Sequence, residues 1–264
     1  MLTMSTQMGK VNMSPLKERP EQNNYELIKI QDDIRKYFEW SLSADIKSAR
    51  KLLDKIDASN VNNWSPINRE NHLQNIIEKL YSNKDKIVII GAAVTSLEII
   101  ELLKSNNFFI LADGSGAVFS TLSDSLAEVA WARSVCVVSD GDGGLGLTLA
   151  IQNEVPVILH AHGDNISSWS KVIDDSISYN TKLKLILTHQ LPDKIEGMYN
   201  FGGFTDGDRA VCFIRSIGVP KERILIIGTR TDIVGQWSGV TNNKLKMSKL
   251  KWMEKILKII NIDY

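Results

Sequence analysis

Short apolar runs alternate with stretches of helical periodicity through the second part of the chain. Six runs of four or five largely apolar residues occur, at positions 87–90, 108–111, 135–138, 155–159, 183–187 and 224–227. The segments between them place apolar residues three or four positions apart and predict helices, over residues 95–104, 118–131, 147–152, 166–178 and 205–217. Strands that alternate with helices form parallel βαβ units. The pattern therefore predicts an α/β fold with a Rossmann-like, mostly parallel sheet and helices on both faces.

The regions on either side of these runs have a different pattern. Apolar positions recur at helical spacing from residue 25 to residue 81, and a basic amphipathic pattern covers residues 244–260. The first residues carry four methionines, so the true start methionine is open, and we expect disorder there. We expect four segments: a disordered start at 1–24, a helical N-terminal unit at 25–85, an α/β catalytic domain at 86–235, and a basic C-terminal helix within 236–264 that packs on that domain.

Composition and hydropathy describe an ordinary globular protein. Hydrophobic residues make up 43% of the chain and charged residues 23%, as in soluble folded domains. No apolar run approaches the roughly 18 residues that a membrane-spanning helix needs, and the first residues lack the apolar core of a secretory signal. We therefore expect a cytoplasmic protein with no membrane partner, in which Cys136 and Cys212 are buried, reduced thiols.

The net charge of zero results from segments of opposite charge. The chain carries 31 basic and 31 acidic side chains, which gives a formal charge of zero. A nonspecific nucleic-acid-binding protein needs a basic excess, so we expect no nucleic acid partner. Residues 87–235 hold 11 basic and 17 acidic side chains, whereas residues 236–264 hold 6 basic and 2 acidic ones. An acidic α/β domain is thus offset by a lysine-rich tail.

Aspartates follow three successive predicted strands. Asp113 follows the second strand, Asp140 and Asp142 follow the third, and Asp164 follows the fourth, and each cluster contains a glycine. In open α/β sheets ligands bind at the carboxyl ends of the strands, so we expect these carboxylates to converge. Converging carboxylates repel one another unless a cation lies between them, and oxygen ligands without thiolates suit a hard ion. The pattern predicts a Mg²⁺ site, although aspartates beside glycines are also common in turns and helix caps.

A fourth cluster precedes the predicted helix at 205–217. Thr205 and Asp208 have the spacing of a capping box, which accounts for part of it. Two glycines and two aromatic residues accompany them, and Arg209 can fork onto a phosphate, which favours a ligand-binding loop. The long connection that begins at residue 189 supports the same interpretation.

Other motifs in the chain are weaker. A glycine-rich window at 141–146 formally matches a dinucleotide-binding fingerprint, but its aspartates would repel a pyrophosphate, and the lysine of a P-loop is missing. His160 and His162 point to the same side of an extended segment and, with Asp164, form a possible zinc site. Hydrogen bonding of a neutral histidine to a phosphate, an aspartate or the backbone is the favoured alternative.

The clusters together carry a resemblance to a known family. The chain resembles the archaeal 6-hydroxymethylpterin diphosphokinase family over residues 86–252, in the strings Ala112-Asp-Gly114, Ser139-Asp-Gly-Asp-Gly143, His160-Ala-His-Gly-Asp-Asn165, Gly202-Gly-Phe-Thr-Asp-Gly-Asp-Arg-Ala210 and the lysine-rich 244–250. That family is similar in fold to the thiamin pyrophosphokinases. The chain departs from it at Gly141, where the family usually has leucine, and at Gly91-Ala-Ala-Val-Thr-Ser96, which replaces a glycine-rich opening.

The resemblance implies transfer of diphosphate from ATP to the hydroxymethyl group of 6-hydroxymethyl-7,8-dihydropterin, with release of AMP, in tetrahydromethanopterin or folate-type pterin synthesis. It implies Mg²⁺ held by catalytic aspartates, with Arg209 beside them, the aspartates being Asp113, Asp140, Asp142 and Asp164. The acidic domain and the lysine-rich tail would then meet a magnesium triphosphate together. ATP and the pterin alcohol would contact Gly91, Gly114, His160, His162, Asn165, Gly202, Gly203, Thr205, Asp206, Asp208, Lys244 and Lys246.

Further hypotheses stay open at this point. Phe201 or Phe204 can stack on the pterin ring, although core packing explains either residue equally well. The alternatives in function are a thiamin pyrophosphokinase, a metal-dependent nucleotide-sugar transferase and a noncatalytic nucleotide-sensing module. The choice between a monomer and a homodimer, the number of magnesium ions and the identity of the catalytic base also stay open.

Overall fold

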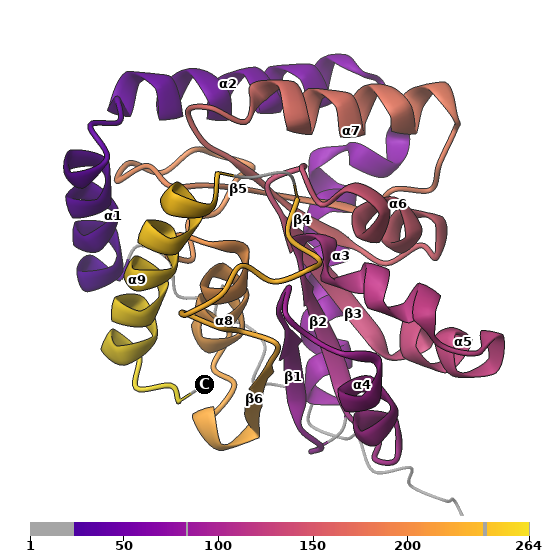
Figure 1. Ribbon diagram of the computed structural model, residues 1–264. Coiled ribbons are helices and arrows are strands. Elements are labelled where there is room, and N and C mark those ends of the chain that lie inside the picture. Colours follow the sequence, from indigo (N-terminus) through magenta and orange to yellow (C-terminus); the bar gives the residue numbers. More distant parts are fainter. Residues whose placement is uncertain (1–23, 83, 240–241, 264) are drawn as a thin grey trace, which may run out of the picture.

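The computed structural model describes residues 24–82, 84–239 and 242–263, so the disorder expected for residues 1–24 concerns a segment that lies, apart from its last residue, outside the described residues. One sheet of six parallel strands occupies the centre, in the order β5-β4-β3-β2-β1-β6 (Figure 1). The strands are β1 (Ile87–Ile90), β2 (Phe108–Ala112), β3 (Ser134–Ser139), β4 (Val157–Ala161), β5 (Leu185–His189) and β6 (Ile224–Ile227). The predicted α/β fold is confirmed, and the described sheet is parallel throughout.

Helices cover both faces of the sheet because of the direction of its connections. The crossovers from β1 to β5 all advance toward the same edge, and right-handed crossovers then place their helices on one face, whereas the return from β5 to β6 places its helix on the other. The first group comprises α4 (Ser96–Leu103), α5 (Asp124–Arg133), α6 (Gly144–Gln152) and α7 (Ile166–Ser178). The opposite face carries α8 (Asp206–Ser216) and α9 (Asn243–Ile259). Alternate residues of β1 enter the two hydrophobic clusters, as the period of a strand requires.

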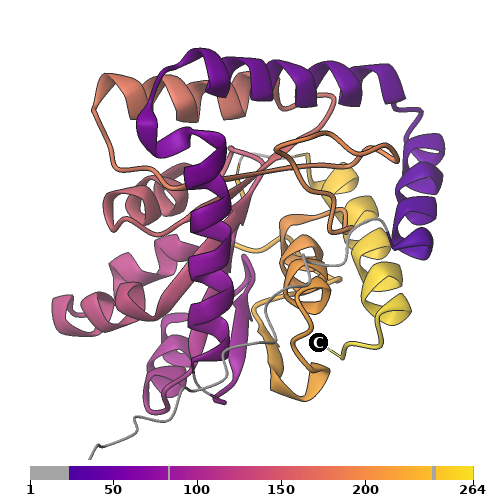
Figure 2. The same cartoon turned by 180° about the vertical axis from the view of Figure 1, so that it is seen from behind.

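Of the three N-terminal helices, the second and third pack on the same sheet, whereas the first packs against α8 and α9. They are α1 (Tyr25–Tyr37), α2 (Leu42–Ala58) and α3 (Pro66–Tyr81). Leu52 of α2 joins the cluster of α4 to α7, and Leu73 of α3 joins the cluster of α8 and α9. Seen from behind, α3 crosses the sheet while α2 lies beside α7 (Figure 2). The helical N-terminal unit therefore contributes to both faces of the α/β domain.

One predicted helix begins later than expected. Residues 118–121 belong to a 3-10 segment, η2 (Asp113–Thr121), and α5 starts only at Asp124. The segment packs against α6 so closely that a Cβ on Gly146 would lie 2.1 Å from the carbonyl oxygen of Gly114. This backbone contact favours the 3-10 conformation of η2, and α5 begins only after that segment ends.

Two further expectations concern burial and the membrane. Cys136 and Cys212 are both buried and free, as predicted. Among the described residues, no helix combines the length and the apolar character that crossing a membrane requires.

Candidate active site

Three carboxylates meet at the carboxyl edge of the sheet, and we call them the carboxylate cluster. Asp113 follows β2, Asp140 follows β3, and Asp206 opens α8. One oxygen of each lies within 4.8 Å of the others. Parallel strands end at one edge, which explains why the two strand-end residues approach each other. Asp206, expected among the substrate contacts, lies within this cluster.

The backbone around Asp113 is shaped for close approach. Asp113 has a φ of +50°, which is uncommon for a residue with a side chain, and its Oδ1 accepts a hydrogen bond of 2.7 Å from Ser139 Oγ. A Cβ on Gly143 would lie 2.6 Å from the same Oδ1. Glycine at this position therefore lets the loop after β3 pass directly beside the carboxylate.

Burial and mutual repulsion raise the pKa values of several site carboxyls. Burial, followed by the charges of the neighbouring aspartates, raises the pKa of Asp113 well above its usual range. Burial and then the charge of Asp140 raise the pKa of Asp206 to about 7, although Arg209 opposes this shift. The same two causes, in the same order, raise the pKa of Asp142 to about 6. The ionised forms of these carboxyls are therefore disfavoured where they lie together, and a cation between them would favour ionisation.

Asp140 is the anionic centre of the site. Burial raises its pKa, but the hydrogen bond and the positive charge of His162 outweigh that effect and lower the pKa below its usual range. His162 Nε2 lies 3.0 Å from Asp140 Oδ2. The other carboxylate oxygen, Oδ1, is buried and has no hydrogen-bond partner among the described residues. A buried ionised oxygen without a partner is costly, which indicates a place for a bound cation.

His162 links Asp140 to Asp164 and does not have the geometry of a zinc ligand. Its Nδ1 lies 2.6 Å from Asp164 Oδ1, so both ring nitrogens face carboxylates. Burial lowers the pKa of His162, but the two hydrogen bonds outweigh burial and raise it to about 9. A protonated imidazole offers no lone pair to a metal. Asp164, expected as a metal ligand, thus pairs with this imidazolium, and its side chain is largely exposed.

His160 is a buried neutral residue. Its Nδ1 lies 3.0 Å from Thr188 Oγ1, and burial, followed by the charge of Arg209, lowers its pKa well below the usual range. The substrate contact predicted for His160 stays a prediction, because the residue lies outside the linings of the two pockets described below.

Asp206 and Asp208 both lie in the first turn of α8 but have different partners. Asp208 and Thr205 form the predicted capping box, in which Asp208 accepts hydrogen bonds of 2.7 Å from the backbone N–H groups of Phe204 and Thr205. Asp206 instead lies 3.3 Å from Arg209 Nη1. The capping box therefore accounts for Asp208, while Asp206 faces the carboxylate cluster.

Arg209 is held beside the cluster by its neighbours. Its Nη2 donates a hydrogen bond of 3.3 Å to Gln190 Oε1. Gly202 and Gly203 have φ values of +88° and +87°, and a Cβ on Gly203 would lie 2.8 Å from the backbone nitrogen of Arg209. Gly203 thus lets the loop pass close to the arginine, whereas a Cβ on Gly202 would lie 2.7 Å from Leu27 Cδ1 of α1.

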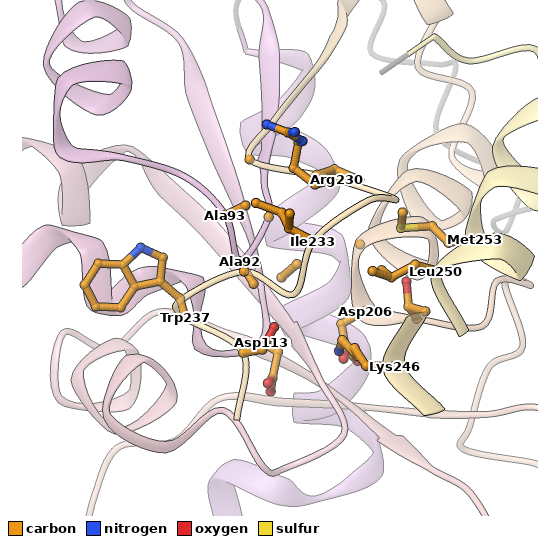
Figure 3. Close-up of a pocket in the computed structure, with 18 residues that line it drawn as sticks. Ala92, Ala93, Asp113, Asp206, Arg230, Ile233, Trp237, Lys246, Leu250 and Met253 are labelled. Carbon is orange, nitrogen blue, oxygen red and sulfur yellow. The ribbon is translucent and has the colours of Figure 1, made fainter. Parts of the chain in front are cut away.

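Two pockets flank the carboxylate cluster, and both are lined by Asp113, Asp206 and Lys246. The glycine pocket lies over the ends of β1, β2 and β6 and is lined by Gly91, Gly228, Arg230 and apolar side chains of α9. Figure 3 shows the two aspartates and Lys246 at one end of it and Arg230 at the other. A Cβ on Gly91 would lie 2.6 Å from the carbonyl oxygen of Gly228, so the segments after β1 and β6 leave no room for a side chain at position 91.

The aromatic pocket lies on the other side of the cluster, over β3, β4 and β5. It is lined by Trp40, Phe204, Gln190, Arg209 and Lys249, together with Asp140, Asp142 and His162. Phe201 lies elsewhere, stacked on Tyr199 in the cluster of α8 and α9. Of the two phenylalanines considered from sequence, Phe204 is the one beside the site.

Asn165 and Lys244 take positions away from these pockets. The Asn165 amide accepts hydrogen bonds from the backbone N–H of His162 and from Ser48 Oγ, and it donates to the carbonyls of Asp140 and His160. These four bonds use the whole amide, so Asn165 holds the loops after β3 and β4 together. Lys244 lies in the exposed first turn of α9, two residues from Lys246.

Several pocket residues escaped the sequence analysis. Arg230 follows β6, so the strand-end rule applied to the sixth strand would have found it. Trp40 and Gln190 lie in an interhelical segment and a long connection, and Lys249 is one lysine among many in α9. No local pattern distinguishes these three from ordinary surface or packing residues.

Comparisons with known proteins identify relatives of this chain. No family model matches the chain. The 6-hydroxymethyl-7,8-dihydropterin pyrophosphokinase of Pyrococcus furiosus is 32% identical over 178 residues, which cover 65% of this chain and 70% of that protein. The protein of the same name from Methanocaldococcus jannaschii is 30% identical over 209 residues, or 75% of this chain and 74% of that one. The chain therefore belongs to the 6-hydroxymethyl-7,8-dihydropterin pyrophosphokinase family, a family of diphosphokinase enzymes.

Proposed function

We propose that this protein transfers the diphosphate group of ATP to the hydroxymethyl oxygen of 6-hydroxymethyl-7,8-dihydropterin in tetrahydromethanopterin or folate-type pterin synthesis. The names of the two relatives support the acceptor. The observation that carries the proposal is the convergence of three aspartates between two pockets. Transfer between two substrates needs such a centre, with one substrate held on each side.

The residues of the carboxylate cluster fit Mg²⁺. They supply hard oxygen ligands, and the unpartnered Oδ1 of Asp140 is a ready ligand atom. We propose Asp113, Asp140 and Asp206 as ligands, with Asp142 adjacent, and Asp164 acting through His162. When bound there, Mg²⁺ neutralises phosphate charge and orients the triphosphate.

The side chains around the cluster position the reactants. Arg209 and Lys246 supply positive charge beside the cluster, where they can hold the triphosphate. The hydroxyl oxygen of the acceptor forms a bond to the β-phosphorus, and the bond from that phosphorus to the oxygen shared with the α-phosphate breaks, so AMP leaves with that oxygen. Asp142 lies at the rim of the aromatic pocket with a pKa raised to about 6, which suits it to accept the hydroxyl proton.

The test is product analysis with the purified protein. Incubation with ATP, the pterin alcohol and MgCl₂ should give AMP and the pterin diphosphate in equal amounts, and chelation by EDTA should stop the reaction. Thiamin or a UDP-sugar in place of the pterin distinguishes the alternative transferases. Nucleotide binding without turnover on any acceptor would overturn the proposal in favour of a sensing module.

Asp140→Asn is the sharpest variant for this test. It removes one charge without changing the shape of the side chain, and we expect turnover to fall about a thousandfold because the metal contributes several kcal/mol to the transition state. Asp193→Asn, at an exposed loop position, is the matched control and should keep full activity. Equal activity of the two variants would contradict the assignment of Asp140 as a ligand.

A further inference from the structure

The segment between α1 and α2 reaches the site from the N-terminal unit. Trp40 lies between the end of α1 and the start of α2, and its half-buried side chain lines the aromatic pocket. Helix α1 runs beside α9, which carries Lys246 and Lys249 into the same pocket (Figure 1). A residue far from the aspartate motifs in sequence thus forms part of the wall around them.

A buried polar network fixes this segment to the loops of the site. Arg35 of α1 donates a hydrogen bond of 2.9 Å to the backbone carbonyl of Gln190. Asp45 of α2 accepts from the side chain of Gln190 at 2.9 Å and from the backbone N–H of Gly163 at 2.8 Å. Since buried hydrogen bonds to charged groups are strong, Trp40 is held at a defined place relative to the loops after β4 and β5.

Trp40 belongs to an aromatic group that presents a face to the pocket. Phe38 stacks on Trp40 with 4.7 Å between ring centroids, and Phe204 lies 5.9 Å from Trp40. The ammonium of Lys249 lies 5.2 Å from the Trp40 centroid and 5.9 Å from that of Phe204. Because the lysine side chain is flexible, the Lys249 ammonium can move away from the rings. The rings thus offer an electron-rich face to a flat ligand.

The chemistry of transfer assigns the two pockets to different substrates. Displacement at phosphorus places the attacking oxygen and the leaving group on opposite sides, so AMP and the acceptor must flank the carboxylate cluster. The glycine pocket lies between the ends of β1 and β6, where the strand order reverses, and nucleotides bind at such switch points. The aromatic pocket is then left for the acceptor.

We propose that Trp40, together with Phe204, forms the stacking surface for the planar ring system of the acceptor. This assignment rests on the proposed function and deepens it, because it gives the N-terminal unit a role in substrate choice. Lys249 leaves the ring faces when the heterocycle enters and then adds positive charge next to the triphosphate. Trp40 is in this view a specificity-determining residue, separate from the aspartates that carry the reaction.

The test compares Trp40→Leu with Trp40→Phe in steady-state kinetics. Leucine keeps an apolar contact with Phe38 but removes the π face, whereas phenylalanine keeps a smaller one. We expect Trp40→Leu to raise KM for the pterin alcohol about tenfold or more and Trp40→Phe about threefold or less, since stacking on an aromatic side chain has an effect of this order. KM for ATP should change less than twofold in both variants.

Tyr37→Ala is the matched control. Tyr37 belongs to the same junction and contacts Phe38 and Trp252, but the residue is 61% exposed and lies outside the pocket lining. It should keep the wild-type KM for both substrates. Thermal melts of all variants show whether any loss comes from unfolding.

The possible failures are distinguishable. Absence of turnover by the wild-type protein with the pterin alcohol would contradict the proposed function, and calorimetric binding of 6-hydroxymethylpterin to wild type and Trp40→Leu would then test the stacking surface alone. Turnover by the wild type with an unchanged pterin KM in Trp40→Leu would overturn the role of Trp40. An increase in the KM for ATP alone would also overturn it, because the two substrates would then occupy the opposite pockets.

Discussion

The two pockets beside the carboxylate cluster are built in different ways. The glycine pocket consists largely of backbone, small residues and apolar side chains at the ends of neighbouring strands, with Gly91 and Gly228 in van der Waals contact. The aromatic pocket consists of large and charged side chains from elements far apart in sequence, such as Trp40, Gln190 and Lys249. Backbone lining suits phosphate and ribose groups common to all nucleotides, whereas side-chain lining distinguishes one acceptor from another.

The two pockets thus differ in what they can recognise: the glycine pocket suits groups that all nucleotides share, and the aromatic pocket suits one particular acceptor. The loops at the ends of β1, β2 and β6, together with the start of α8 and side chains of α9, line the first pocket, and none of its lining residues belongs to the N-terminal unit. The second pocket needs α1 and α2, whose buried hydrogen bonds hold the loops after β4 and β5. Variants that act on one pocket, or on the cluster that both share, therefore test this division.

Among the variants that compare the two pockets, the largest effect is expected at Asp206, where the pockets meet. Asp206 lines both pockets and belongs to the carboxylate cluster. Asp206→Asn should lower kcat about a hundredfold or more, because loss of a ligand charge weakens metal binding and phosphate neutralisation together. Assays at saturating ATP and pterin, with MgCl₂ titrated, should show a raised requirement for magnesium.

Asp208→Asn is the paired control for this variant. Asp208 is fully buried and pairs with Thr205 in the capping box of α8, so the substitution should lower the free energy of unfolding by about 1 kcal/mol. Its magnesium requirement should match that of the wild type. A similar requirement in both variants would show that the two aspartates do not differ in role.

A smaller effect is expected at the far end of the glycine pocket. The side chain of Arg230, labelled at the far end of the pocket in Figure 3, is exposed and donates hydrogen bonds to Asp232. Arg230→Ala should raise KM for ATP about tenfold, since an arginine contact to a charged group is worth about 1.5–3 kcal/mol, with the pterin KM unchanged. An equal rise in both KM values would contradict the assignment of ATP and the acceptor to different pockets.

The smallest effect expected is a pH dependence of stabilisation by magnesium. The pKa values of Asp142 and Asp206 are raised to about 6 and about 7. Carboxyls with raised pKa values contribute stability that is complete below about pH 4 and lost as the pH rises through 6 and 7. Metal binding removes this repulsion but needs the ionised forms.

MgCl₂ should therefore raise the Tm by several degrees at pH 8 and by much less at pH 5. Differential scanning fluorimetry at the two pH values measures this difference, with Asp206→Asn as a variant in which it shrinks. An increase that is the same at both pH values would show that these carboxyls do not take part in binding the metal.

The sequence predicted the fold because its signals are local. Each strand of the parallel sheet is buried on both faces and so reads as a continuous apolar run, such as residues 87–90. The predicted bounds of α6, β4 and β5 differ from the structure by two or three residues, and the start of α5 differs most. Its position depends on the tight packing of η2 on α6, through a contact between Gly114 and Gly146, which lie far apart in the chain. Periodicity contains no information about such backbone contacts.

By itself, the sequence determined the parallel α/β architecture and the aspartates at its strand ends, since the alternation of runs fixes which edge receives each residue after a strand. Only the tertiary structure decided which carboxylates meet: it places Asp206 with Asp113 and Asp140, and it pairs Asp164 with His162. The tertiary structure also brought Trp40 to the site. Contacts of this kind depend on how α8 packs on the sheet and how α1 packs on α8 and α9, and side-chain packing between distant elements leaves no periodic trace along the chain.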